Sequence, residues 1–159
     1  MSNKLFGSVR ANRPTMNKFD LSHEVKMSMK MGTLTPFFLQ PVIPGDRVRT
    51  NSETFLRFAP MIAPVMHRIN VYTHYFFVPN RLVWDNWENF ITGGEDGDFS
   101  VAPPKVTMNA TNSAMFDRGS LSDYFGLPVI NTGVNPTQGV QVDALPFRSY
   151  QLIWNEYYR

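Results

Sequence analysis

The chain has 159 residues, a formal net charge of +2, 43% hydrophobic and 18% charged residues, and no cysteine. The lack of cysteine excludes disulfides, thiolate metal sites and a cysteine nucleophile, and no stretch approaches the roughly 20 apolar residues of a membrane span. The charge is uneven, because residues 1–68 carry ten Lys and Arg against four Asp and Glu, whereas residues 69–159 carry five against nine.

Residues 1–22 lack hydrophobic periodicity and contain scattered basic and small polar residues. We expect this segment to form an extended basic N-terminal arm that orders on a neighbour. Its residues Lys4, Arg10, Arg13 and Lys18 are candidates for contact with nucleic acid or with a neighbouring molecule, because phosphate contacts need charge and reach but no fixed geometry. A solvated tail is the alternative interpretation.

Three segments have the patterns of β-strands. Residues 24–32 alternate strictly between apolar and polar, residues 47–58 return to extended character after a Pro-Gly-Asp turn, and residues 69–78 are rich in aromatic and β-branched side chains. Proline-containing turns separate them and no helical pattern intervenes, which predicts an antiparallel sheet. Large apolar groups on both faces of 69–78 predict an interior strand.

A helix is predicted from Asn80, a possible cap, to the stop at Gly93. Trp84 and Trp87 share one face of it, which suits either the core or a subunit interface, with core the more common use of such a face. Residues 92–142 are rich in Gly, Pro, Asn and Ser and predict a loop-rich excursion with little regular structure.

Two further helices are predicted in the second half of the chain. Ser120 caps a short one that ends at Gly126, with Asp123 in the capping-box position. Asp143 caps a last helix, in which Trp154 is a further candidate for core or interface. The residues expected on its buried face are Phe147, Tyr150, Ile153 or Trp154, and Tyr157.

The motifs of a catalytic or metal site are lacking in the sequence. The three histidines are not at ligand spacing, and the acidic residues Glu95, Asp96 and Asp98 lack the alternating ligands of a calcium loop. No nucleophile elbow, phosphate loop or dinucleotide fingerprint occurs. We therefore expect a protein that is not an enzyme and that binds no cofactor or metal.

Three classes of protein fit these patterns to different degrees. A shell protein would use aromatic-rich strands, long loops and a basic arm to bury surface against its own copies. A single-stranded nucleic-acid-binding β-domain would need exposed aromatics beside basic residues on one face, and the face with Lys26 and Lys30 has none. A jelly-roll enzyme or lectin would need a clustered site, which the sequence lacks.

Several sequence blocks carry a family resemblance, in this order along the chain: Met-Lys-Met-Gly at 29–32, Pro-Gly-Asp at 44–46, His-Tyr-Phe-Phe-Val-Pro-Asn-Arg at 74–81 followed by Trp84 and Trp87, Gly-Ser-Leu-Ser-Asp-Tyr-Phe-Gly-Leu-Pro at 119–128, Leu-Pro-Phe-Arg-Ser-Tyr at 145–150, and Ile-Trp-Asn-Glu-Tyr-Tyr-Arg at 153–159. They resemble the major capsid protein of microviruses, the small single-stranded DNA bacteriophages, and the gokushovirus branch most of all. Members of that family are much longer, so the chain corresponds to the N-terminal portion of such a protein.

The resemblance implies a mostly β fold, an eight-stranded antiparallel viral jelly roll with long loop insertions and short helices. This chain would supply the arm at 1–22 and, at 23–159, the N-terminal part of one jelly-roll domain, with 92–142 a loop-rich insertion. Copies would form an icosahedral shell around single-stranded DNA, in a virion assembled in the bacterial cytoplasm. Other implied partners are phage scaffolding proteins, minor virion proteins and the host cell surface. We also expect the chain to aggregate or to stay partly unfolded when it is made alone, because an incomplete barrel leaves sheet edges unpaired.

Overall fold

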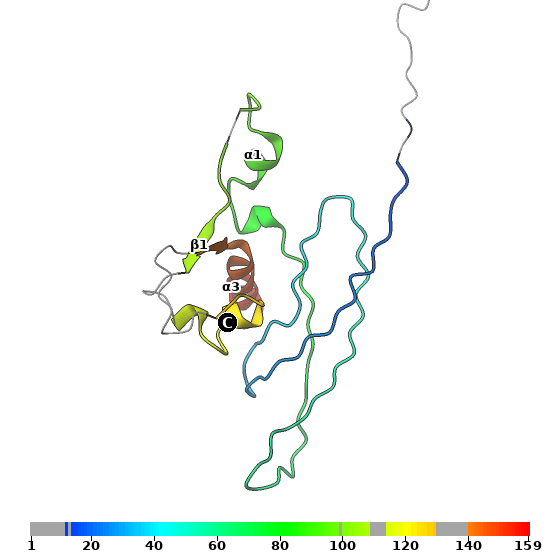
Figure 1. Cartoon of the computed structure of the whole chain (residues 1–159), viewed down its shortest axis with the longest axis vertical. Helices are drawn as coiled ribbons and strands as arrows, with labels where there is room; N and C mark the ends of the chain where they lie inside the picture. Colours follow the sequence, from blue (N-terminus) through cyan, green and yellow to red (C-terminus); the bar gives the residue numbers. More distant parts are fainter. Residues whose placement is uncertain (1–11, 13, 99, 109–113, 130–139) are drawn as a thin grey trace, which may run out of the picture.

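The computed structural model describes residues 12, 14–98, 100–108, 114–129 and 140–159. In chain order its elements are η1 (Asn80–Leu82), α1 (Trp87–Thr92), β1 (Lys105–Met108), α2 (Leu121–Tyr124), β2 (Val140–Asp143) and α3 (Leu145–Tyr157). Every one of these elements follows residue 79. Figure 1 shows the earlier chain, coloured blue to green, as long excursions without strand arrows beside a compact C-terminal part.

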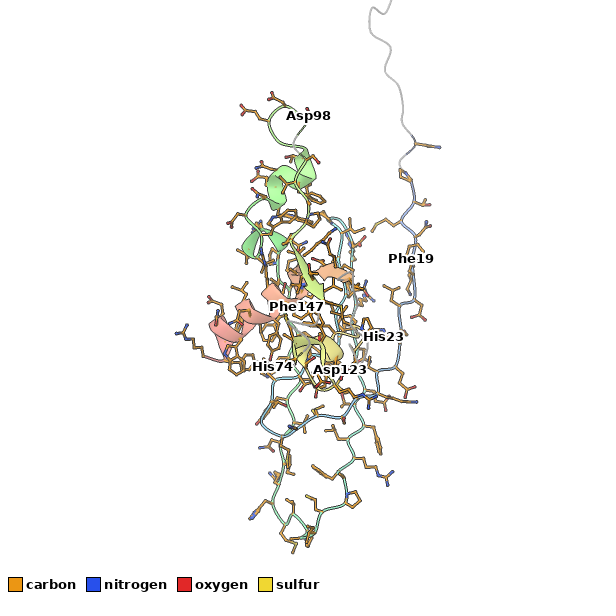
Figure 2. The ribbon with its side chains drawn as sticks, turned by 60° about the vertical axis from the view of Figure 1, so that its left-hand side comes forward. Phe19, His23, His74, Asp98, Asp123 and Phe147 are labelled. Carbon is orange, nitrogen blue, oxygen red and sulfur yellow. The ribbon has the colours of Figure 1, made fainter. Side chains whose placement is uncertain are left out.

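The hydrophobic core lies in the described residues of 104–159, which we call the compact unit. β1 pairs antiparallel with β2, so that Lys105 faces Asp143 and Met108 faces Val140. Against this pair of strands pack Phe116, which is 0% exposed, and Phe147 of α3. Figure 2 shows Phe147 in the middle of this region. The partly buried residues around this core are Val106, Leu121, Phe125, Leu127 and Val142.

The two C-terminal helices form where the sequence predicts them. α2 begins after Ser120, and Gly126 follows its end with a left-handed φ of 78°. The Asp123 carboxylate accepts a hydrogen bond of 2.8 Å from the amide of Gly119. In a capping box it would accept from the amide of the N-cap residue, Ser120, so the bond is displaced by one residue. At α3, a carboxylate oxygen of Asp143 accepts a hydrogen bond of 3.0 Å from the Leu145 amide, and so satisfies one of the amides that a helix start leaves free.

The helix predicted from Asn80 to Gly93 is interrupted. The chain forms η1, leaves helical structure over residues 83–86, and then forms α1, which ends at Gly93 with a φ of 81°. Asp and Asn side chains compete with helical backbone bonds, and β-branched and aromatic residues lose rotamer freedom in a helix. The predicted stop is confirmed, whereas the predicted continuity of this helix is wrong.

The segments predicted as strands, 24–32, 47–58 and 69–78, belong to no sheet in the part of the chain that the structure describes. Within the described residues up to 78, one backbone–backbone hydrogen bond forms, from the Asp46 amide to the Ile43 carbonyl at 3.1 Å. A strand is stable only when it pairs with another strand, and the alternation within a segment does not specify which partner that is. The one sheet of the described residues is antiparallel and two-stranded, and the jelly roll stays a prediction.

The stretch 92–142 contains more regular structure than its composition predicts. It contributes β1, α2, most of β2 and the core residues Met108 and Phe116. Met108 belongs to a strand of four residues, and Phe116 ends the short apolar run at 114–116, so both stretches are too short to show a periodicity in the sequence. Among the described helices, none has the length and hydropathy that crossing a bilayer requires.

Candidate functional site

Side-chain hydrogen bonds between described residues join the compact unit to the preceding chain, and we call four of them the tethers. They join Tyr124 Oη to the Ser28 carbonyl at 3.0 Å, Arg148 Nη1 to the Val83 carbonyl at 3.0 Å, Tyr150 Oη to the Leu34 carbonyl at 2.9 Å, and Tyr158 Oη to His74 Nδ1. The partners are 65 to 116 residues apart in the sequence. In three of the four, a side chain of α2 or α3 donates to a main-chain carbonyl.

Tyr150, on α3, is a partly buried tyrosine of the tethers. Burial raises the pKa of the Tyr150 hydroxyl above its ordinary value, because the phenolate would lose hydration there. Its hydroxyl therefore stays protonated and remains a donor to Leu34 throughout the neutral pH range.

Aromatic rings gather where α3 ends against residues 74–76, and we call this cluster the aromatic junction. The rings of Phe76 and Tyr157 have centroids 4.8 Å apart, and His74 is stacked on Tyr158 at 6.0 Å with an interplanar angle of 16°. Such pairs contribute about 0.5–1.5 kcal/mol each beyond the area they bury. With Tyr75 they line a cavity of about 400 Å³, which is open to solvent.

Two of the three tryptophans proposed for core or interface lie in one cluster. Trp84 is 7% exposed, and its ring lies 6.1 Å from Trp87 and 5.2 Å from Phe90. The two rings therefore lie together, although Trp84 precedes α1 and does not share a helix face with Trp87. The burial of Trp84 fits the core interpretation, and the role of the pair stays a prediction. Arg148 holds the neighbouring Val83 carbonyl and so links this cluster to α3.

Trp154 lies apart from that cluster, on α3. It is 41% exposed and is stacked on Tyr158 at 6.2 Å, next to the aromatic junction. Contact of any of the three tryptophans with another subunit stays a prediction.

Of the four basic residues proposed to contact nucleic acid or a neighbour, the structure describes one, Lys18. Lys4, Arg10 and Arg13 lie outside the described residues, whereas Lys18 is exposed. Figure 2 shows the neighbouring Phe19 on an arm that runs apart from the compact unit. The Asp20 carboxylate accepts hydrogen bonds from the hydroxyl and from the amide of Ser22. These bonds, the hydroxyl bond more than the amide bond, lower the pKa of the Asp20 carboxyl. A role of Lys18 in binding stays a prediction.

Clusters of metal-ligating side chains are lacking in the described parts of the chain. No group of three or more His, Asp or Glu side chains there is placed to hold a metal ion. Figure 2 shows Asp98, from the acidic loop, at an outlying tip of the molecule. The surface instead offers aromatic and apolar contact area, which is suited to binding other protein.

The described chain before η1 exposes many large apolar side chains. Phe55 is 89% exposed, and the others that are more than half exposed are Met16, Phe19, Leu21, Met31, Ile43, Val48, Phe58, Ile62, Met66, Val71, Tyr72 and Phe77. Large apolar side chains exposed in such numbers leave surface that is suited to being covered by other protein.

Sequence reasoning missed the donors of the tethers. Tyr124 and Arg148 were not singled out as functional, and Tyr150 was assigned only to a buried helix face. Their motifs, Asp-Tyr-Phe-Gly and Phe-Arg-Ser-Tyr, place polar tips beside apolar residues. That pattern predicts a side chain whose apolar part is buried and whose polar end forms a hydrogen bond, but it does not identify the acceptor.

Comparison with known proteins gives one family and several relatives. Residues 7–159 match the family described as capsid protein (F protein). The chain is 35% identical over 154 residues to capsid protein VP1 of Bdellovibrio phage phiMH2K, and 38% identical over 153 residues to capsid protein VP1 of Chlamydia phage 1. These alignments cover 97% and 90% of this chain, but 28% and 24% of the two relatives. The chain thus spans about a quarter of their length.

Another relative is more distant. Capsid protein VP1 of Spiroplasma virus 4 is 29% identical over 155 residues, which cover 97% of this chain and 27% of that protein. The similarity extends over nearly the whole chain and includes both the extended segments and the compact unit.

Proposed function

This chain belongs to the phage family of capsid proteins (F protein), and from that membership we propose that it is the N-terminal part of a major capsid subunit. Copies of the whole subunit assemble into an icosahedral shell that encloses a single-stranded DNA genome. The protein is structural, acts in the virion and carries out no reaction.

The observation that carries this proposal is the family match over residues 7–159, together with relatives that are all named capsid proteins. A match confined to one motif would support a shared domain only. Here the match begins within the N-terminal arm, at residue 7, and includes the tryptophan cluster and α3.

The unpaired extended segments support the finer proposal of a jelly roll. Their backbone amides and carbonyls need partners wherever they are removed from water, and another strand of the same subunit supplies them at the lowest cost in entropy. Since the chain spans about a quarter of its relatives, we place those partner strands in the rest of the whole protein. Residues 23–159 then form the first part of one domain, with 92–142 as an insertion.

The remaining proposals concern partners. The basic arm at 1–22, with Lys4, Arg10, Arg13 and Lys18, contacts packaged DNA or a neighbouring subunit by charge. Trp84, Trp87 and Trp154 contribute to the core or to contacts between subunits. Scaffolding proteins, minor virion proteins and the host surface are proposed partners of the assembled shell, and assembly is proposed to occur in the bacterial cytoplasm.

The test begins with the coding DNA downstream of the Arg159 codon. An open frame that continues with alternating strand patterns is expected, and expression of that complete frame is expected to give particles of uniform diameter by electron microscopy. Packaged DNA in those particles would resist added nuclease. A complete protein that stays monomeric, or that forms only amorphous aggregates under every assembly condition, would overturn the proposal.

A further inference from the structure

The compact unit and the chain before it differ sharply in their own order. The compact unit contains the hydrophobic core, the two paired strands and α3. In contrast, the described residues up to 78 have one backbone–backbone hydrogen bond among themselves. Local order therefore resides in the compact unit and in η1 and α1, and the position of the extended segments up to residue 78 depends on what they contact outside themselves.

One extended segment is held on both sides of a tight turn. The turn at Met31 and Gly32 has a left-handed Gly32, with φ of 78°. Tyr124 of α2 donates to the Ser28 carbonyl before this turn, and Tyr150 of α3 donates to the Leu34 carbonyl after it. Two elements of the compact unit thus fix both arms of the same turn.

The second segment is held by α3 as well. Arg148 donates to the Val83 carbonyl, and Tyr158 hydrogen-bonds to His74. The two held segments also meet, because the rings of Phe37 and Tyr75 lie edge to face with centroids 6.1 Å apart. Helix α3 therefore contacts both segments and sets their distance from each other.

The chemistry of the tethers suits the holding of backbone rather than of particular side chains. A hydroxyl or guanidinium that donates to a carbonyl fixes both the distance and the direction of that peptide group. In the segment 28–34, the carbonyls of Ser28, Lys30 and Leu34 accept hydrogen bonds, and the other main-chain carbonyls have no protein partner among the described residues. Those groups are free to pair with an added strand.

We infer that the compact unit is an internal template: through the tethers it holds the extended segments around residues 28–34 and 74–79, the latter together with η1 that follows it, in fixed positions, so that further strands add to segments that are already aligned. The inference goes beyond the proposed function, because it assigns the ordering of one part of the chain to another part and is independent of whether a shell forms. Its physical basis is entropic, since segments held in advance lose less freedom when they pair.

The test measures one distance in the whole chain. Because the chain has no cysteine, Met31→Cys and Glu156→Cys provide two unique labelling sites, both exposed, one at the turn and one on α3. Nitroxides on these sites, with an excess of unlabelled chain to suppress contacts between molecules, give the intramolecular distance by double electron–electron resonance. A narrow distribution is expected.

The donors are then removed without loss of ring volume. Tyr124→Phe and Tyr150→Phe are each expected to lower the ratio of the docked to the undocked population about two- to tenfold, as one hydrogen bond implies. The double variant should broaden the distribution while far-UV circular dichroism still reports α3. The matched control is Tyr157→Phe, whose hydroxyl has no hydrogen-bond partner among the described residues, and it should leave the distribution unchanged.

Two outcomes would overturn the inference. One is a broad distribution in the chain with all tyrosines intact, which would mean that the compact unit does not position the turn. The other is a double variant as narrow as the parent, which would mean that packing, and not the tethers, holds the segment.

Discussion

The hydroxyl of Tyr150 donates a 2.9 Å hydrogen bond to the main-chain carbonyl of Leu34, although the two residues are 116 positions apart. The bond joins the most regular element of the molecule, α3, to a segment without secondary structure. Its strength depends on a proton, because only the neutral phenol can donate.

The stability that Tyr150 provides is expected to depend on pH. Burial raises the pKa of Tyr150 in the folded state above that in the unfolded chain, so the folded state keeps the proton longer. The contribution is complete below the ordinary tyrosine pKa of about 10 and is lost as the pH rises through the folded-state pKa. The free-energy difference between the parent and Tyr150→Phe should therefore be constant from pH 7 to about 9 and shrink above about 10.

Denaturant unfolding at a series of pH values, followed by circular dichroism of α3, measures this difference. Tyr157→Phe is the control, because it removes a more exposed hydroxyl from the same helix. A difference that stays constant to pH 11 would contradict the expected role of the Tyr150 proton.

Truncation of Phe116 is expected to destabilise the compact unit strongly. Phe116 is fully buried against Phe147, so Phe116→Ala leaves a cavity in a small core and should cost about 3–5 kcal/mol of unfolding free energy. Phe55→Ala removes the same ring from a site that is 89% exposed and should change that free energy by less than about 0.5 kcal/mol. Urea midpoints of the two variants give the comparison, and equal midpoints would contradict the assigned core.

Ser122 is a buried polar residue whose removal should be costly. It is 1% exposed, donates its hydroxyl hydrogen to the Met115 carbonyl and also hydrogen-bonds with Ser120. Ser122→Ala removes a buried hydroxyl and its bond to the Met115 carbonyl, and it is expected to cost about 0.5–1.5 kcal/mol, the net contribution of a typical hydrogen bond. Ser52→Ala, at an exposed position, is the control in the same thermal-unfolding experiment, and a loss as small as that of the control would argue against the bond.

Two glycines of the loop after α1 form a matched pair. Both Gly93 and Gly97 have left-handed φ angles, of 81° and 74°, so alanine is conformationally strained at either position. A Cβ at Gly93 would also lie 3.2 Å from the Gly97 backbone, whereas a Cβ at Gly97 would meet nothing within 4 Å. Gly93→Ala is thus expected to increase amide hydrogen exchange in α1 more than Gly97→Ala does, and a reversed order would contradict the close approach of the Gly97 backbone to Gly93.

The isolated chain is expected to self-associate. Its extended segments expose apolar side chains and unpaired backbone groups, which pair readily with those of other copies. Sedimentation velocity from micromolar concentrations upward should show aggregates or a broad range of species. A single monomeric boundary together with a sharp thermal transition of the whole chain would contradict this expectation.

The sequence alone determined the local features whose signals are local. The stop at Gly93, the start of α2 after Ser120 and the start of α3 shortly after Asp143 depend on residues within one or two turns, and each lies where it is predicted, although the Ser120 side chain makes no capping hydrogen bond. The family resemblance likewise depended on ordered local blocks, and the match over residues 7–159 confirms it.

Only the tertiary structure decided which residues form the core and which segments are held together. Phe116 and Met108 lie in stretches too short to show a periodicity, and become core because the β1–β2 pair and α3 enclose them. The alternating segments 24–32 and 69–78 do not pair in the described structure, because a strand is completed by hydrogen bonds to a partner that its own sequence does not specify. The bond from Tyr150 to Leu34 is of the same kind: a hydroxyl beside apolar residues predicts a partner, but only the fold supplies one from 116 residues away.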